Sequence, residues 1–286
     1  MSLKKLIVIL FFIIGLFLLI VTNTSWLSFG QSEKEVNVTD EIDLIEIDVS
    51  GVSTTIIPDD RNHVSTEYTG NGKVSIVENG DTISIDFEAK HFFNVLSWFK
   101  KNHLTIYLPE DYDRDLDINS GSGSLRFSGQ SKNNPMKLEN LSLDMSSGNV
   151  QLRNLSTTHF EQDGSSGSVS IDSLSTKTGS FNMSSGNMDV KEYSGKVEAE
   201  LSSGRLLLGM KNVTDTINLG VKSGFTTLDL PSDADFTLSG EIGSGAITTD
   251  FNLTNSKKDE HNLVGVHGSG KHAIQLKVNS GKIEIK

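Results

Sequence analysis

The sequence predicts an all-β fold, a β-solenoid with β-helix-like repeats and Ser-Gly corners, placed behind one N-terminal transmembrane helix. Three observations in the 286 residues lead to this prediction. Of the 26 glycines, 14 directly follow a serine, while proline occurs only 4 times. Apolar and polar residues alternate over long stretches, which is the period of a half-buried strand. One short motif also recurs about every 20 positions, as it does in arrays of stacked repeats.

The N-terminal segment predicts a membrane anchor. Residues 6–21 are uncharged and apolar, Lys4 and Lys5 precede them, and Thr22 and Trp26 extend the segment toward the length of a bilayer span. We therefore expect a cytoplasmic N-terminus at 1–5, a transmembrane anchor at 6–22 and an extracytoplasmic remainder in the cell membrane. A cleaved signal peptide is the alternative, but VTNTSWLSF follows the segment without a small-residue cleavage site.

Residues 23–38 read as a polar linker, and residues 39–110 as a β-rich part with hairpins and a hydrophobic cap. Alternating residues such as Ile83, Ile85 and Phe87 indicate strands. The pair Asn79-Gly80 predicts a type I′ hairpin turn, because both residues tolerate a positive φ. Whether this part continues the solenoid or forms a separate sandwich is open at this level.

Residues 111–286 contain the repeats, for example LDMSSGNVQL, FNMSSGNMDV and LKVNSGKIEI. Alternation sends Val150 and Leu152 of one repeat to the interior, as it does Val169 and Ile171 of the next. Roughly nine rungs stacked about 4.8 Å apart would form a column on the order of 43 Å long. The aligned glycines are Gly123, Gly148, Gly167, Gly186, Gly204, Gly224, Gly245 and Gly270, with Gly281 closing the chain.

A Ser-Gly pair can also belong to a phosphate-binding loop. Such loops need a Gly-Lys-Ser/Thr sequence or a strand-turn-helix context, and neither occurs here. Structural corners are therefore the better interpretation, since glycine permits a positive φ or a close approach of another backbone. The corners assigned in this way are Gly123, Gly148, Gly167, Gly186, Gly204, Gly224, Gly245 and Gly281.

The anchor behind two lysines, the segment LTIYLPED at 104–111 and the serial SSG corners resemble the bacterial “putative adhesin” β-solenoid family. The resemblance covers residues 1–286. It implies an extracytoplasmic, non-enzymatic protein linked to cell-envelope stress from wall-active antibiotics. It carries over no catalytic residue, because the family label itself names no chemistry.

The segment HFFNVLSWFKKN, at 91–102, carries apolar residues at helical spacing and ends in two lysines and an asparagine. One interpretation is an amphipathic element in contact with lipid or a partner through Phe92, Phe93, Trp98 and Phe99. The other is a hydrophobic lid over the open end of the solenoid. The lid is favoured, because a dozen residues make a weak interfacial helix.

Two groups of polar residues are candidate metal ligands. Asp111, Asp113, Asp115 and Asp117 alternate, yet they lack the glycine and the distal glutamate of a calcium loop. His261, His267 and His272 match no zinc spacing. We expect no metal and no cofactor. No Ser/His/Asp order or G-x-S-x-G elbow occurs, so we also expect no enzyme activity.

The net charge of the chain indicates which classes of partner it favours. The net charge of −12 argues against nucleic acid, and without the two cytoplasmic lysines the remainder carries −14. This favours cationic peptides, including antimicrobial ones, or envelope-stress membrane proteins, in addition to lipid around the anchor. The alternative is a structural scaffold or adhesin-like protein that pairs with a membrane or wall neighbour. The last strand, VNSGKIEIK, would offer it an open edge guarded by Lys277, Lys282 and Lys286.

Overall fold

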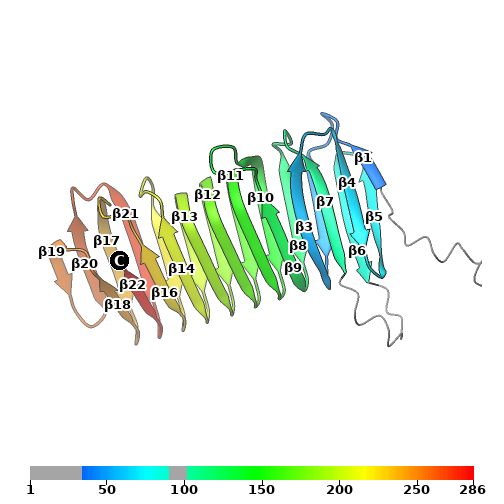
Figure 1. Ribbon diagram of the computed structural model, residues 1–286. Helices are drawn as coiled ribbons and strands as arrows, with labels where there is room; N and C mark the ends of the chain where they lie inside the picture. The colour runs from blue at the N-terminus through cyan, green and yellow to red at the C-terminus, as the bar shows by residue number, and fades with distance from the viewer. Residues whose placement is uncertain (1–33, 90–101) are drawn as a thin grey trace, which may run out of the picture.

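The computed structural model describes residues 34–89 and 102–286, which form an elongated column of strands (Figure 1). The prediction of an all-β solenoid is confirmed. No helix long and apolar enough to cross a bilayer is found within the two described ranges. The expected anchor at 6–22 lies outside them, as does the segment with Phe92, Phe93, Trp98 and Phe99.

The column consists of two layers of mostly parallel strands. The long strands β11 (Asn149–Gly164), β12 (Ser168–Met183) and β13 (Asn187–Leu201) bend and contribute their N-terminal halves to layer B and their C-terminal halves to layer A. In order, layer A is β5 (Gly72–Asn79), β6 (Thr82–Ala89), β2 (Leu44–Val49), β8 (Asp115–Ser120), β10 (Met136–Met145), β11 (Asn149–Gly164), β12 (Ser168–Met183), β13 (Asn187–Leu201), β15 (Ile217–Val221), β21 (His272–Val278), β17 (Phe236–Ile242), β20 (Asn262–His267) and β19 (Thr254–Lys258). Layer B is β1 (Lys34–Asn37), β4 (His63–Thr69), β7 (His103–Pro109), β3 (Val52–Asp59), β9 (Gly123–Ser128), β11, β12, β13, β14 (Arg205–Met210), β16 (Phe225–Asp229), β22 (Lys282–Ile285) and β18 (Ala246–Thr249).

Alternation along each strand places apolar side chains between the layers. Val150, Leu152, Val169 and Ile171 are all buried, which confirms their predicted inward orientation. Identical positions of successive rungs lie side by side, so that Val150 is in register with Val169. Burying each such side chain contributes about 1.5–3 kcal/mol, and because the rungs stack, the contribution recurs along the column.

The corner glycines form a column of their own. Gly148 and Gly186 have φ values of 114° and 124°, which L side chains rarely adopt. A Cβ at either position would also collide with the carbonyl oxygen of the preceding corner, Gly123 or Gly167. Gly224, Gly245 and Gly281 lack the positive φ, but there too a Cβ would meet the carbonyl oxygen of a neighbouring corner. In stacking order the glycines are Gly123, Gly148, Gly167, Gly186, Gly204, Gly224, Gly281 and Gly245.

A second bend in the central rungs uses residues other than glycine. Asn154, Ser173 and Glu192 have φ values of 53°, 64° and 53°, and they occupy equivalent places in consecutive rungs. Asn154 donates a side-chain hydrogen bond to the Gly129 carbonyl at 3.4 Å, consistent with the tolerance of asparagine for this conformation. Periodicity alone did not indicate this bend.

The rungs do not stack in chain order. Ten occur among the described residues, against about nine expected. Named by their layer A strands, they run β6, β2, β8, β10, β11, β12, β13, β15, β21 and β17.

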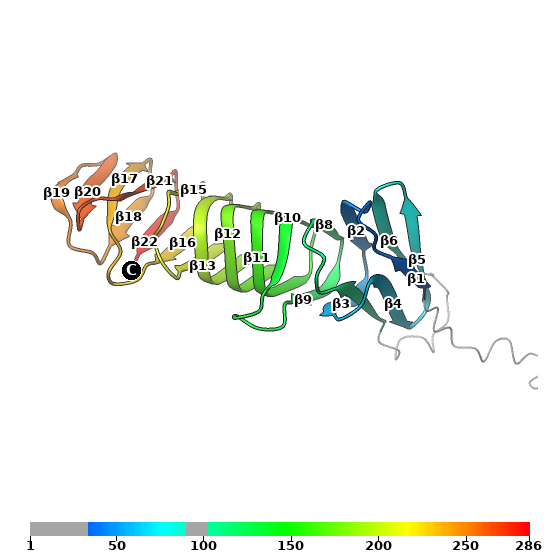
Figure 2. The same ribbon diagram turned by 90° about the horizontal axis from the view of Figure 1, so that it is seen from above.

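The rungs that come first and last in chain order therefore each lie between two other rungs of the column. The C-terminus accordingly lies inside the column, short of the tip that β19 and β20 form (Figures 1 and 2). The expected open edge at the last strand is therefore wrong, because β22 pairs with β16 on one side and β18 on the other. Lys282 and Lys286 contact Glu284 of their own strand, so they guard no edge.

The part before residue 110 continues the column. Strands β2–β3 and β6–β7 supply two of its rungs, and β1, β4 and β5 add antiparallel strands at its end. The predicted turn type is wrong. Asn79 pairs with Thr82, so Gly80 and Asp81 are the central residues, and only Gly80 has a positive φ, at 65°. This is the pattern of a type II′ turn, which like type I′ matches the twist of the strands.

Gly270 is not a corner, contrary to its alignment with the others. It lies in the turn between β20 and β21, with a φ of 79°. Its amide donates to Asp235 Oδ1 at 2.6 Å, and the amide of Lys271 donates to the same oxygen at 2.9 Å. Sequence spacing could not distinguish this turn from a corner, because both place glycine after serine before a strand.

Candidate binding face

The outward side chains of layer A form two long rows. Neighbouring members of a row lie about 4.8 Å apart, because they are registered partners on adjacent strands. From Asn119 onward, the first row takes the residue four positions before each corner glycine, and the second takes the residue six before. The first row is Asp86, Asp48, Asn119, Asp144, Asp163, Asn182, Glu200, Gly220, Lys277 and Glu241. The second row is Ser84, Glu46, Asp117, Ser142, Glu161, Ser180, Glu198, Asn218, Gln275 and Ser239.

Carboxylates gather over strands β6, β2, β8, β10 and β11 of this layer. We call this outer surface the acidic face. Direct like-charge neighbours occur twice in the first row, at Asp86–Asp48 and Asp144–Asp163. Its carboxylates are those of Glu46, Asp48, Asp86, Glu88, Asp115, Asp117, Asp144, Glu161 and Asp163.

Three hollows in layer A join into one trough. The first, of about 740 Å³, runs from Asp48 along the corners to Lys222. The second, of about 470 Å³, and the third, of about 510 Å³, follow the middle of the layer. Ser180 and Glu198 line both of the latter, and Asn182 and Glu200 line both the first and the third. The trough therefore continues over several rungs and is lined mainly by polar side chains.

Partial burial and neighbouring charge together alter the acidity of this face. Partial burial, followed by repulsion from Asp48, Glu46 and Glu88, raises the pKa of Asp86 above its ordinary value. The pKa of Asp117 is raised by its partial burial first and then by Glu46, Asp115 and Asp144. Such carboxyl groups favour a nearby cation, because it would relieve their mutual repulsion.

Few groups on this layer neutralise the carboxylates. Asn140 donates to Asp115 at 2.7 Å, and Ser84 donates to Glu46 at 3.1 Å. Two lysines pair with glutamates farther along, Lys196 with Glu198 at 2.9 Å and Lys277 with Glu241 at 3.3 Å. Among the described residues, no ion pair forms at Asp48, Asp86, Asp117, Asp144, Glu161 or Asp163.

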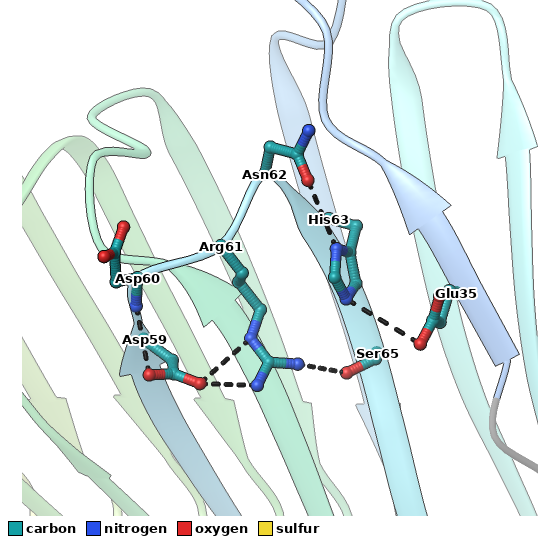
Figure 3. Close-up of polar contacts among 7 residues, drawn as sticks. All are labelled: Glu35, Asp59, Asp60, Arg61, Asn62, His63 and Ser65. Atoms are coloured by element: carbon teal, nitrogen blue, oxygen red, sulfur yellow. Dashed lines mark hydrogen bonds and ion pairs between the residues drawn. The ribbon is translucent and has the colours of Figure 1, made fainter.

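Layer B forms several ion pairs on its own surface. Lys191 lies 3.4 Å from Asp189, and Lys132 lies 3.8 Å from Asp172 and 2.6 Å from Glu192. The same holds at the β3–β4 connection, where Figure 3 shows Arg61 joined to Asp59 and Ser65.

The Arg61 guanidinium donates to Asp59 through Nε at 3.2 Å and to Ser65 Oγ at 2.6 Å. Its hydrogen bonds to Asp59 are the main reason that the pKa of this carboxyl is lowered. Arg61 also lies over the Tyr107 ring, 4.4 Å from its centroid. These contacts pair the Arg61 guanidinium with Asp59 inside the cluster, so the cluster presents little unpaired charge to a ligand.

The candidate metal ligands are dispersed. Asp115 and Asp117 belong to the acidic face, whereas Asp111 and Asp113 lie in the exposed turn before β8. His267 packs against Phe251, with ring centroids 4.8 Å apart. No group of three or more His, Asp or Glu side chains that could hold a metal ion occurs in the described part of the chain.

The acidic face was missed at the level of sequence, although a signal for it exists. Asp144, Asp163 and Glu200 each stand four residues before a corner glycine. Reading that single position through all repeats would have predicted a row of mostly acidic and amide side chains.

Comparisons with known proteins agree with this architecture. The family model Toastrack DUF4097 matches residues 42–286. A structure described as a “putative adhesin” from Bacteroides fragilis has a TM-score of 0.51 at 15% identity, covering 89% of this chain and 96% of that one. A “putative adhesin” from Parabacteroides distasonis has a TM-score of 0.45 at 16% identity, covering 89% and 96%. No curated protein matches the chain. A family match over most of the sequence and a solenoid built on stacked corners together show that the chain belongs to the Toastrack DUF4097 family.

Proposed function

We propose that this protein is a membrane-anchored, extracytoplasmic binding module without catalytic activity, whose acidic face takes cationic partners. The observation that carries the proposal is that Asp48, Asp144 and Asp163 line one solvent-open hollow of layer A and form no ion pair among the described residues. An extended polycation could follow the trough and meet carboxylates on successive rungs. Complementary charge accelerates association and selects partners, and contributes less to affinity itself.

The anchor at 6–22 would hold the module at the cell membrane. The anchored family member that the whole chain resembles is LiaG, encoded with the Lia cell-envelope stress system of bacilli. On that resemblance we propose that the cationic partners include antimicrobial peptides met during envelope stress. Digestion with an external protease tests the topology: residues 34–286 should be cut in spheroplasts, and a chain protected there would contradict it.

Binding of a lysine-rich amphipathic peptide to the full chain in neutral-lipid vesicles tests the ligand class. The double variant Asp144→Asn/Asp163→Asn should weaken binding about 3–10-fold at low salt, because it removes two adjacent carboxylates. Added salt should weaken binding to the original chain as well.

The matched control is Asp172→Asn/Asp189→Asn, which changes the net charge equally on layer B. It should leave binding near the original value, because Asp172 and Asp189 are paired with lysines. Equal losses in the two double variants would mean that total charge decides and that the acidic face has no special part. Absence of peptide binding to the original chain would remove the proposal.

A scaffold or adhesin-like role is the second candidate. The observation in its favour is the edge of β18, which pairs on one side only, with β22, among the described strands. Unpaired strand edges can receive a strand of another protein. Crosslinking in intact cells separates the two functions: a protein captured at β18 supports the scaffold, and peptide captured at the acidic face supports the binding module.

A further inference from the structure

The last fifteen residues form a rung that is enclosed by earlier parts of the chain. Strand β21 lies between β15 and β17, and β22 lies between β16 and β18. All four pairings are parallel and unbroken in register. In chain order, both walls of this slot are made before the segment that fills it.

The slot holds its rung through backbone hydrogen bonds on both sides. Lys282 N donates to the Gly224 carbonyl at 3.0 Å, and Lys286 N donates to the Leu228 carbonyl at 2.9 Å. On the opposite side, Ala246 N donates to the Gly281 carbonyl at 3.0 Å. An empty slot would leave two unpaired strand edges in each layer, so the fold requires an occupant.

The rung is also what joins the tip to the column. The tip consists of β17 to β20, and no strand of it pairs with β15 or β16 among the described residues. Its other link is the covalent segment before Phe236. The occupant of the slot therefore fixes the tip in place, whichever chain supplies that occupant.

The connection into the rung is a short turn with two positive-φ glycines, Gly268 at 69° and Gly270 at 79°. Asp235 holds it through Ser269 Oγ, at 2.6 Å, and the amides of Gly270 and Lys271. These bonds lower the pKa of Asp235 to about 2, with the Ser269 hydroxyl as the largest cause. A rung that follows both walls of its slot in the chain and is joined to them through one short turn can be exchanged between copies.

We propose that residues 272–286 are an exchangeable rung, and that a second copy of this chain supplies the same rung to the slot. The match is specific to this sequence. A Cβ at Gly281 would collide with the Gly224 carbonyl, and one at Gly245 would collide with the Gly281 carbonyl. An occupant thus needs glycine at this corner and apolar side chains such as Ile274 and Ile283, which are fully buried. The exchanged pair repeats every contact outside the turn, and confinement to one membrane would raise the concentration of partners.

The absence of cysteine from the chain allows a direct test by disulfide formation. Thr227 on β16 is in register with Glu284 on β22 and with Leu207 on β14. Full-length Thr227→Cys is co-expressed with full-length Glu284→Cys under a different tag. Mild oxidation in the membrane should join the two copies, because exchange brings those positions side by side. The single-chain double variant Thr227→Cys/Glu284→Cys shows that the pair can close.

The matched control combines Thr227→Cys with Leu207→Cys on separate copies. These positions neighbour each other in the same layer but lie outside the exchanged segment. We expect about tenfold more mixed disulfide dimer in the test pair than in the control, whose dimers would come from collision alone. Equal yields would overturn the proposal. Failure of the single-chain pair to close would overturn the placement of the rung, and the exchange with it.

Discussion

The two layers of the column share rungs, corners and core, but their outer surfaces differ. Layer A bears the carboxylates of the acidic face over five neighbouring strands, and none of them forms an ion pair among the described residues. Layer B places opposite charges together, as at Lys191 and Asp189 or at Arg61 and Asp59. Strand geometry cannot be the cause, since both layers have the same spacing. The difference teaches that two layers with the same strand geometry can differ in whether their carboxylates have ion-pair partners.

The largest expected effect on stability comes from a substitution at a corner glycine, because each corner belongs to both layers. Gly186→Ala should lower the free energy of unfolding by roughly 2–4 kcal/mol, because the new Cβ meets the Gly167 carbonyl at a φ of 124°. Chemical denaturation measures it. Gly209→Ala is the control, because the nearest atom there, the Val190 carbonyl oxygen, is 3.5 Å away. Equal stability of Gly186→Ala and the original chain would refute the stacked-corner account.

An intermediate effect on stability should come from a side chain buried between the two layers. Gln162 of layer A is fully buried between Leu143 and Phe181 in register, and neither polar atom of its amide has a partner in the described structure. Gln162→Leu should raise the free energy of unfolding by about 1–2 kcal/mol, since an unpaired buried amide is costly. The control, Gln151→Leu on the outer side of layer B, should be near neutral. A less stable Gln162→Leu chain would indicate an unseen partner, such as a buried water.

The smallest expected effect is on the pH dependence of stability, which should differ between the carboxylates of the two layers. The folded pKa of Asp117 is raised, so its ionised form costs stability at neutral pH, and stability is recovered as pH falls through that pKa. Asp117→Asn should therefore stabilise the neutral protein by about 0.5 kcal/mol and lose this advantage toward pH 4.

Glu284 on layer B should show the opposite sign. Its hydrogen bond from Lys282, and then that from Lys286, lowers its pKa. The resulting stability is present above the unfolded pKa and is lost as pH falls through the folded one. Glu284→Gln should thus destabilise the neutral protein and matter less in acid. Urea denaturation at both pH values measures the two variants, and the same sign for both would remove the contrast between the layers.

Much of the fold followed from local patterns. Alternation placed Val150 and Leu152 inside, and the repeat of Ser-Gly pairs predicted stacked corners, because both signals lie within one rung. The type of the hairpin turn at Gly80 was missed, since it depends on which residues pair across the turn. The acidic face was missed because its registered neighbours lie between 19 residues (Asp144 and Asp163) and 71 residues (Glu46 and Asp117) apart along the chain and become neighbours only when rungs stack.

The sequence by itself determined that the chain is an array of two-strand β units with glycine at the corner of each repeat. It also placed an apolar, anchor-like segment before the array. Only the tertiary structure decided the order of the rungs, with residues 44–59 and 272–286 enclosed by others. The physical reason is that parallel backbone ladders are nearly alike in every rung. Local sequence therefore predicts that a strand will pair, but it does not predict which strand becomes its neighbour. That choice is decided when further strands cover the two ends of the column.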